Sequence, residues 1–410
     1  MKTYKVSVLG DLMCEPPLFE GAKKRNGKFD FWPTFKPLKK LMDEADYVIG
    51  NLETPVAGEK LGYTQCMVSF NAPDEYLDAL KKLGVDMVST ANNHSYDRGM
   101  EGLINTIDAC ERYGIAHTGT YKDPYTKEHN GYFTLPDGTK IAVIASTYGT
   151  NDDLNSMNIT DEVRLACNYH RERYGEKKPG TNNPATPELK ATKALFKELA
   201  GRDLTWDEVV MLKKAMGIPI PYPNDRFFPE VIDKGVKNVY ERDVKEAKKE
   251  KADLIFAIPH SGGQFNVLPG KESIYTMKKL MNLPIDAVFM GHSHTSQKAE
   301  VIKGCPYFYS LGNVTMAPNS IYPEPSTLPE FGIIPHLYIA EGKIVKTTFS
   351  LYEIKMDEKN HMTVWPVDEL YDALATPYEK KHLATRVAEV LERITELPQK
   401  VEKPKREYKL

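Results

Sequence analysis

The chain has 410 residues, of which 41% are hydrophobic and 27% are charged, as in an ordinary globular protein. A chain of this length can hold one large core with elaborations or two domains. Its 54 basic and 57 acidic residues give a net charge of −3, which excludes a global positive field for nucleic acid or an anionic membrane.

The first part of the chain, up to about residue 120, alternates strand-like and helix-like segments. Helical periodicity predicts helices over Thr34–Glu44, Pro73–Leu83 and Met100–Tyr113. The second of these stops at Gly84, which is typical of a helix end. This rhythm of strand, loop and helix indicates a sheet with crossover helices.

The middle of the chain departs from this rhythm. Tyr132–Leu135 and Lys140–Ala145 are predicted to form a β-hairpin, and a polar stretch follows over residues 150–226. That stretch contains two helical patterns, Pro187–Ala200 and Thr205–Ala215. A segment this long between two core strands indicates an insertion. It either shapes access to a site or decorates the surface.

The core pattern resumes with a long charged helix predicted over Phe227–Lys251. Residues 355–410 read as a C-terminal extension with one amphipathic helix, Pro377–Leu397. We therefore expect one domain over residues 1–354, interrupted by the insertion at 150–226, and then the extension.

The cysteines and the apolar runs bear on the compartment. Five cysteines are scattered without a Cys-x-x-Cys pair, which favours free thiols in a reducing environment. No apolar run is long enough for a signal peptide or a transmembrane segment. A cytoplasmic protein is expected.

Polar side chains follow five short apolar runs, at the point where each predicted strand ends. They are Gly10-Asp11, Gly50-Asn51-Leu52-Glu53, Asn92-Asn93-His94, His260 and Gly291-His292-Ser293-His294. In layered α/β proteins the carboxyl ends of strands share one edge, so these groups can meet there. Oxygen and imidazole donors at one edge are what a divalent metal requires. The pattern therefore predicts a metal-dependent hydrolase.

Each of these residues also has an ordinary explanation when it is taken alone. Asp11 could cap a turn, Glu53 could begin a helix, and His260 could be a structural histidine. The occurrence of all the groups at strand ends, in one order, favours a shared site.

Five segments together resemble the CapA-type poly-γ-glutamate capsule biosynthesis proteins of the calcineurin-like metallophosphoesterase superfamily. They are Gly10-Asp11-Leu12-Met13, Gly50-Asn51-Leu52-Glu53, Ala91–Gly99, Gly291-His292-Ser293-His294 and Tyr309–Val314. The resemblance covers roughly residues 4–320 without the insertion. It implies an α/β (α+β) four-layer fold, in which two facing mixed β-sheets are flanked by helices.

The resemblance also implies roles for individual residues. Asp11 and His294 would bind a first metal, Asn93, His260 and His292 a second, and Glu53 would bridge them. His94 would be the general acid, and a bridging hydroxide would be the nucleophile. Asp97 is expected to orient His94. One or two divalent ions are expected: manganese, iron or zinc, with magnesium as an alternative.

Three further residues are candidates for substrate binding. Arg98 has the planar guanidinium that suits phosphate or carboxylate, although it could be a solvated charge. His117 lies in a loop that resembles a family loop near the site, and it could equally be structural. Asn313 could contact substrate or support the rim through loop backbone.

Two departures from the superfamily pattern weaken the expected site. Met13 stands where the first motif usually has a histidine, so the first metal would lose one ligand. Glu53 replaces an aspartate and lengthens the bridge by one methylene. The missing histidine predicts a weaker or mononuclear site, and the longer bridge could change the spacing of the metals.

The leading hypothesis is a hydrolase that acts on a phosphoester or on an amide such as a γ-glutamyl bond, linked by the resemblance to capsule metabolism. Its substrate would be an anionic small molecule or polymer; no nucleic-acid partner is expected, and the oligomeric state is open. The alternative is a non-catalytic, metal- or carboxylate-binding assembly protein for anionic polymer synthesis or export. A structural α/β protein with coincidental histidines is the third hypothesis.

Overall fold

The computed structural model describes residues 2–66, 68–152, 155–171, 187–204, 206–217, 229–318 and 327–410. Parts of the predicted insertion, including residues 172–186 and 218–226, lie outside the described residues. In the described part of the chain, no helix combines the length and the apolar character needed to cross a membrane.

The larger of two sheets contains the first strands of the chain. Its eight strands among the described residues run in the spatial order β13 (Met362–Pro366), β12 (Lys343–Met356), β11 (Phe331–Ala340), β1 (Tyr4–Leu12), β2 (Tyr47–Leu52), β3 (Met87–Ser89) and β4 (Ala116–Thr118), with β14 (Tyr408–Lys409) beside β12. Strands β1 to β4 are parallel. Their carboxyl ends therefore lie at one edge of the sheet.

The smaller sheet is built from strands between residues 131 and 308 of the chain. Its six strands among the described residues are, in order, β5 (Gly131–Thr134), β6 (Lys140–Thr147), β7 (Leu254–His260), β8 (Ala287–Phe289), β10 (Cys305–Phe308) and β9 (Ala299–Ile302). Strands β5 and β6 form the predicted hairpin. Strands β6, β7, β8 and β10 are parallel, so a second set of carboxyl ends meets at one edge.

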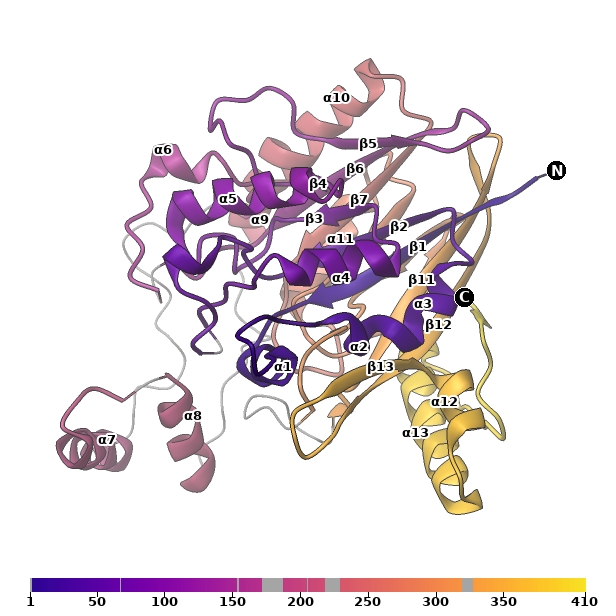
Figure 1. Cartoon of the computed structure of the whole chain (residues 1–410). Coiled ribbons are helices and arrows are strands. Elements are labelled where there is room, and N and C mark those ends of the chain that lie inside the picture. Colours follow the sequence, from indigo (N-terminus) through magenta and orange to yellow (C-terminus); the bar gives the residue numbers. More distant parts are fainter. Residues whose placement is uncertain are drawn as a thin grey trace.

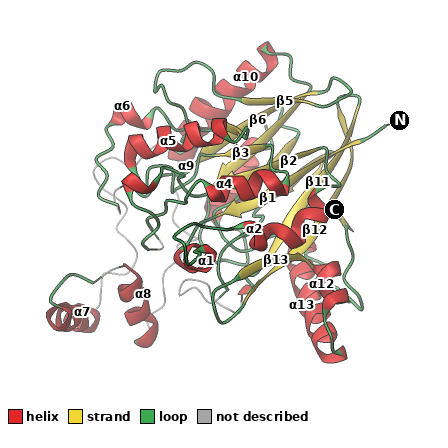
Figure 2. Ribbon diagram, in the orientation of Figure 1, coloured by secondary structure: helices red, strands yellow, loops and turns green. Residues whose placement is uncertain are grey.

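The two sheets face each other across an apolar core (Figures 1 and 2). Val6 and Val8 of β1 pack in one cluster with Val143 of β6, Phe256 of β7 and Phe289 of β8. Strands buried on both faces read as nearly continuous apolar runs, which is why they stood out in the sequence.

Helices cover the outer faces of both sheets and make the other two layers. The larger sheet is covered by α1 (Pro16–Ala22), α2 (Trp32–Phe35), α3 (Lys39–Met42), α4 (Glu75–Leu83) and part of α5 (Gly99–Arg112). The smaller sheet is covered by α9 (Pro229–Val236), α10 (Arg242–Lys249) and α11 (Lys271–Leu280). The predicted fold class, two facing mixed sheets flanked by helices, is confirmed.

Two predicted helices are interrupted. Thr34–Glu44 was expected to be one helix, but a 3-10 turn, Lys36–Leu38, separates α2 from α3. Pro37 lies in this turn, and proline lacks the N–H that a continuous helix needs. The predicted helix Phe227–Lys251 is divided into α9 and α10 by a π-helical turn, Lys237–Glu241.

The C-terminal extension is more elaborate than the single helix predicted for it. It contains two helices, α12 (Val367–Ala373) and α13 (Pro377–Thr395), and its strands β13 and β14 join the larger sheet. A capping box between Thr376 and Glu379 begins α13. Helix α12 was missed because seven residues give too short a periodic pattern.

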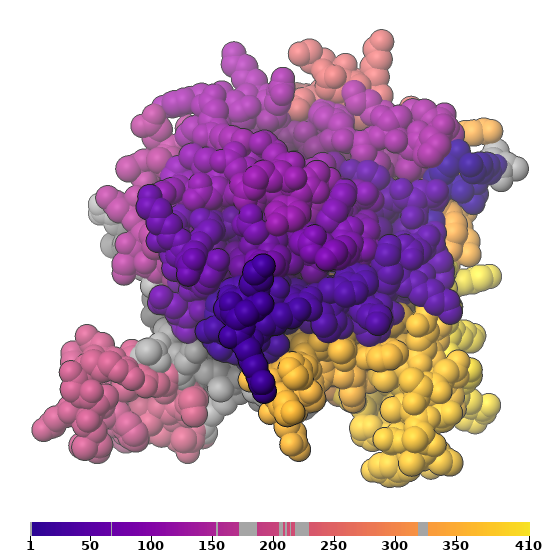
Figure 3. All heavy atoms as spheres, in the orientation of Figure 1, coloured from indigo at the N-terminus to yellow at the C-terminus, as the bar shows by residue number. Residues whose placement is uncertain are grey.

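The described part of the insertion contains three helices, α6 (Asp161–Arg164), α7 (Pro187–Ala200) and α8 (Trp206–Ala215). Helices α7 and α8 have the bounds predicted for them to within one residue. In the space-filling view they project from the body at the lower left (Figure 3). Helix α6 lies against the body instead (Figure 1).

The buried histidine of β11 gives the fold a defined pH dependence. His336 is fully buried, and its ring nitrogens lie 2.8 Å from Ser7 Oγ and 2.8 Å from Ser350 Oγ. Burial, together with the nearby charge of Lys5, lowers its pKa from 6.5 to about 3. Below pH 6.5 the unfolded chain binds a proton that the folded protein does not.

His336 is therefore expected to make the free energy of unfolding decrease as the pH falls from about 6.5 towards 3, by about 1.4 kcal/mol per pH unit in the middle of that window. His336→Gln should remove this contribution, so that unfolding takes up close to one proton fewer in this pH range. Urea unfolding of both proteins at a series of pH values measures it; identical slopes would contradict the assignment.

Candidate metal centre

The edges of the two sheets bring together the six side chains that the sequence predicted as metal ligands. Asp11 lies near the end of β1, Glu53 directly after β2, Asn93 after β3, His260 at the end of β7, and His292 and His294 after β8. All six are buried, with at most 4% of each exposed. Because both sheets contribute, the site lies where the two edges face each other.

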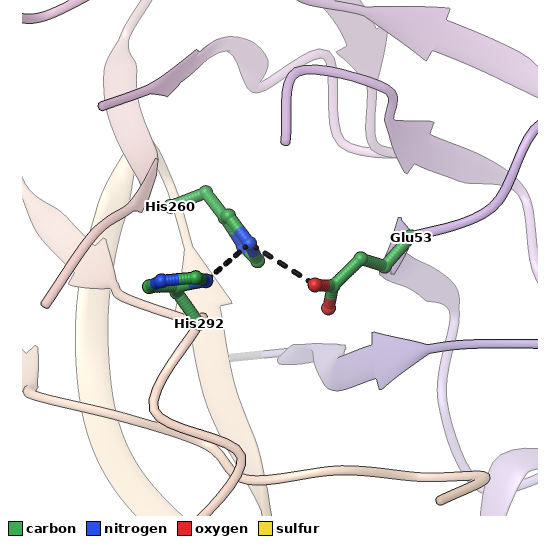
Figure 4. Close-up of side chains that lie close together, drawn as sticks. All are labelled: Glu53, His260 and His292. Carbon is green, nitrogen blue, oxygen red and sulfur yellow. Dashed lines mark hydrogen bonds and ion pairs between the residues drawn. The ribbon is translucent and has the colours of Figure 1, made fainter. Parts of the chain in front are cut away.

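His260 is at the centre of the first group of ligands. Its Nε2 atom is 2.7 Å from Asn93 Oδ1, 3.2 Å from Glu53 Oε1 and 3.2 Å from His292 Nδ1. Figure 4 shows the imidazole of His260 between Glu53 and His292. Glu53, His260 and His292 together form a group with one ligand atom each that could hold a metal ion.

Glu53 also belongs to a second group, with Asp11 and His294. His294 Nδ1 lies 3.3 Å from Asp11 Oδ2, and His294 Nε2 lies 3.7 Å from Glu53 Oε1. The two groups therefore share one carboxylate, the arrangement that the resemblance implied for two ions bridged by Glu53.

The donor atoms of these groups fit divalent ions. Ligand atoms about 2.1 Å from one ion are about 3.0–3.4 Å apart when the bond angles are about 90–109°. The distances from His260 Nε2 to Glu53 Oε1 and to His292 Nδ1, and that from Asp11 Oδ2 to His294 Nδ1, lie in this range, whereas Asn93 Oδ1 lies closer to His260 Nε2, at 2.7 Å. Both carboxylate oxygens of Glu53 are buried without a hydrogen-bond partner. The imidazoles of His260 and His294 lie 3.2 Å and 3.7 Å from its Oε1 atom, and a cation held between these groups would compensate the buried charge.

A third group of similar composition provides a contrast. His129, Asp243 and Glu246 also have ligand atoms close together. Here Arg242 Nε lies 2.5 Å from Asp243 Oδ1, and the backbone N–H of His129 donates to Glu246 at 3.1 Å. These carboxylates are compensated by the protein, so the group has no need of an ion.

The backbone after β8 is shaped to place its two histidines. His292 has φ of +89° and His294 has φ of +55°, a region that residues other than glycine seldom adopt. A Cβ atom on Gly291 would lie 2.5 Å from Asp11 Oδ1, so glycine is needed for this close approach. Such strain is maintained where surrounding contacts compensate it, as at functional sites.

Asn51 is a residue of the site that the sequence interpretation did not assign. Its Nδ2 donates to Asp11 Oδ1 at 2.8 Å and lies 3.2 Å from His260 Nδ1. Its Oδ1 accepts from Asn92 at 3.2 Å. Asn51 therefore orients one ligand from each sheet. The sequence does contain a signal for this role: Asn51 lies two residues before Glu53, and residues two apart point to the same side of an extended chain.

Burial and the neighbouring charges shift the pKa values of three of the predicted ligands. Burial raises the pKa of Asp11, but the hydrogen bond to His294 and the charge of His260 outweigh it and hold the pKa at about 2. Burial lowers the pKa of His294, but Glu53 and Asp11 raise it to about 9. Burial and the neighbouring His260 hold the pKa of His292 well below 6.5. Asp11 and His292 are thus in the states that a metal requires, and His294 must lose a proton.

His94 and Asp97 form a buried pair beside Asn93. His94 Nδ1 lies 2.6 Å from Asp97 Oδ2. The same Asp97 oxygen accepts from the backbone N–H of Phe70 at 2.7 Å, and the Phe70 ring stacks on the imidazole at 4.1 Å. Asn155 donates to the other oxygen at 2.8 Å. The imidazole is held in one orientation, as the prediction that Asp97 orients His94 requires.

The three candidates for substrate binding lie in different places. The guanidinium of Arg98 donates to the carbonyls of Gly62 at 2.9 Å and Tyr63 at 3.2 Å, so it secures a loop. His117 lies on the edge strand β4, with Nε2 3.8 Å from Glu111 Oε1. Asn313 donates to the backbone carbonyl of His294 at 2.9 Å, which supports the rim. A contact of any of them with substrate stays a prediction.

The start of the insertion and the residue before it reach the site. Tyr148 directly follows β6 and precedes the insertion; its ring lies 4.6 Å from the imidazole of His292, centroid to centroid, and its backbone N–H donates to His260 O at 3.0 Å. Within the insertion, the backbone N–H of Asn151 donates to Asn93 O at 2.7 Å. This contact, with that of Asn155, places the first residues of the insertion beside the metal ligands, whereas α7 and α8 project from the body.

Comparisons with known proteins identify the family of the chain. Residues 5–317 match the bacterial capsule synthesis protein family PGA_cap. Capsule biosynthesis protein CapA of Bacillus anthracis is 23% identical over 311 residues, which are 75% of this chain and 58% of that protein. PGA biosynthesis protein CapA of Bacillus subtilis (strain 168) is 23% identical over 322 residues, which are 76% of this chain and 64% of that protein. The matches thus span about three fifths of the length of these relatives.

The solved structure of TT1561 of Thermus thermophilus aligns with 89% of this chain and 99% of its own chain, with 9% identity and a TM-score of 0.35. A likeness at this level carries no argument about function.

Two facing mixed sheets, with carboxylate and imidazole groups gathered where their edges meet, define a protein of the metallophosphoesterase-like class. Within this class, the chain belongs to the bacterial capsule synthesis (PGA_cap) family, whose match covers most of its length. The family resemblance inferred from the five sequence segments is confirmed.

Proposed function

We propose that the protein is a metal-dependent hydrolase that cleaves a phosphoester or an amide, with an anionic small molecule or polymer as substrate. The observation that carries the proposal is the Glu53 carboxylate. It is fully buried, belongs to both ligand groups and has no hydrogen bond at either oxygen. The names of the curated relatives support a link of this activity to capsule or poly-γ-glutamate metabolism.

A divalent ion bound here would supply a Lewis acid that acidifies water and stabilises negative charge on the attacked group. Asp11 and His294 would hold one ion, and Asn93, His260 and His292 another, with Glu53 between them. Asn51 would keep Asp11 and His260 in place.

His94 would give a proton to the leaving group. Asp97 Oδ2 accepts the hydrogen on His94 Nδ1, so the exchangeable proton is at Nε2. Because the Phe70 ring and the Asp97 carboxylate fix the imidazole, little reorganisation would accompany the transfer. An oriented general acid is what a hydrolase requires, whereas the non-catalytic assembly role suggested by Met13 needs no proton transfer.

The proposal is tested by assaying protein loaded with manganese, and protein treated with EDTA, against bis(p-nitrophenyl) phosphate, p-nitrophenyl phosphate and γ-glutamyl peptides. We expect metal-dependent turnover of one class. Manganese bound at the centre with no turnover of either class would contradict the hydrolase and support the assembly role.

A further inference from the structure

The loop after β7 places a glutamine beside the candidate metal centre. Gln264 lies in the loop that follows the ligand His260, and its side chain is half-buried. Its Nε2 atom lies 3.5 Å from Nε2 of His294. It therefore borders the group that His294 forms with Asp11 and Glu53.

Several contacts hold this loop against the loop after β8. The backbone N–H of Phe265 donates to Ser293 O at 2.6 Å, and the Phe265 ring lies 5.6 Å from the imidazole of His294, centroid to centroid. Gln297 Nε2 donates to the carbonyl oxygen of Asn266 at 2.7 Å. Phe265 has φ of +56°, a strained value for a residue other than glycine that such contacts compensate. The side chain that precedes Phe265 is thereby kept at the centre.

The ligand group beside Gln264 has room for a further ligand. Three side chains form this group. A manganese ion typically takes about six ligands, most of them oxygen atoms, so three side chains leave positions open. The 3.5 Å between Gln264 Nε2 and His294 Nε2 is only slightly longer than the spacing of about 3.0–3.4 Å expected between two ligands of one ion.

The carboxamide of Gln264 has the chemistry of such a ligand. Its carbonyl oxygen is a neutral donor of the kind that suits manganese. A half-turn about the last side-chain bond exchanges this oxygen with the nitrogen and leaves the shape of the group nearly unchanged, so either atom can face His294. Within the part of the chain that the structure describes, no group donates a hydrogen bond to Gln264 Oε1, so an ion would not compete with one.

We propose that Gln264 is a further ligand of the ion held by Asp11, Glu53 and His294, which it binds through its carbonyl oxygen. Two carboxylates, one imidazole and one amide would then hold this ion. The inference rests on the metal centre of the proposed function, and it does not depend on hydrolysis.

The test is isothermal titration calorimetry of manganese chloride into the full chain after its metal has been removed with EDTA. In the wild type we expect two binding events. Gln264→Met has a similar volume and no oxygen, so it should weaken one event by at least about tenfold and leave the other unchanged. Gln264→Glu should strengthen the same event, because oxygen sites for divalent ions bind more tightly when their ligands carry more charge.

Anomalous diffraction from crystals grown with manganese assigns the event to its place. In Gln264→Met the peak beside His294 and Asp11 should weaken, and the peak beside His260 and His292 should remain. Gln399→Met is the matched control, because Gln399 is also half-buried and its amide donates to Thr395 in the C-terminal extension. It should bind manganese as the wild type does.

The proposal would be overturned if Gln264→Met bound manganese like the wild type. It would also be overturned if Gln264→Met and Gln264→Glu weakened the same event alike, since the side chain would then only support the loop. A wild type that bound no manganese would contradict the metal centre, and the proposed function with it. Manganese binding that depends on Gln264, without turnover of any substrate, would contradict the hydrolase alone.

Discussion

Glu53→Gln is expected to lower the affinity for divalent metal by at least about a hundredfold, because this carboxylate belongs to both ligand groups. Changing an outer-shell partner of a metal ligand typically costs about 10–100-fold, and a shared ligand should cost more. Glutamine keeps the shape and removes the charge, so the loss would report on the charge at the centre. Inductively coupled plasma mass spectrometry after dialysis against manganese measures the bound metal.

Glu246→Gln is the control for this experiment, because Glu246 belongs to the third group of similar composition. It should leave the metal content unchanged. Thermal unfolding of both variants shows whether they remain folded. Full metal content in Glu53→Gln, or metal loss in Glu246→Gln, would contradict the location of the centre.

His94→Ala should retain the metal and lose turnover by roughly 10²–10⁴-fold, the usual contribution of a positioned general acid. The reason is the geometry: His94 is held by Asp97 and Phe70 and is not a member of either ligand group. Steady-state kinetics on the substrate class found active, with metal analysis of the same samples, measures both quantities.

His361→Ala is a suitable control, since His361 is an exposed histidine paired with Asp357. Its turnover should equal that of the wild type. If His94→Ala lost its metal, His94 would be a ligand; if it kept full turnover, it would not be the acid.

The position of the site could be predicted from the sequence because it follows from strand topology. Asp11, Asn93 and His260 each come at the end of a short apolar run, and parallel strands place such ends at one edge. Parallel pairing places these ends at one edge of each sheet, and the structure adds that the two edges face each other.

The support around the ligands could not be predicted in the same way. Asn51 contacts a ligand of the other sheet 209 residues away, and Tyr148 contacts His292 across another long stretch of the chain. Such pairs leave no periodic trace, because they depend on how distant strands are placed against each other. The sequence interpretation left the insertion undecided between a role at the site and a surface position for the same reason.

The C-terminal extension shows which helices and strands can be predicted from a sequence and which cannot. Strand β14 is two residues long and is defined by its pairing with Thr348 and Phe349 of β12. Helix α13, by contrast, was predicted because nineteen residues carry a clear apolar face. Long periodic elements are visible in a sequence, whereas short ones depend on their neighbours in the fold.

The most direct test of the metal centre is anomalous diffraction from crystals grown with manganese. An anomalous peak should lie among Glu53, His260 and His292, with a second, weaker peak among Asp11, Glu53 and His294, where Met13 provides no imidazole. A map without a peak at either place, or with its peak at His129, Asp243 and Glu246, would contradict the account.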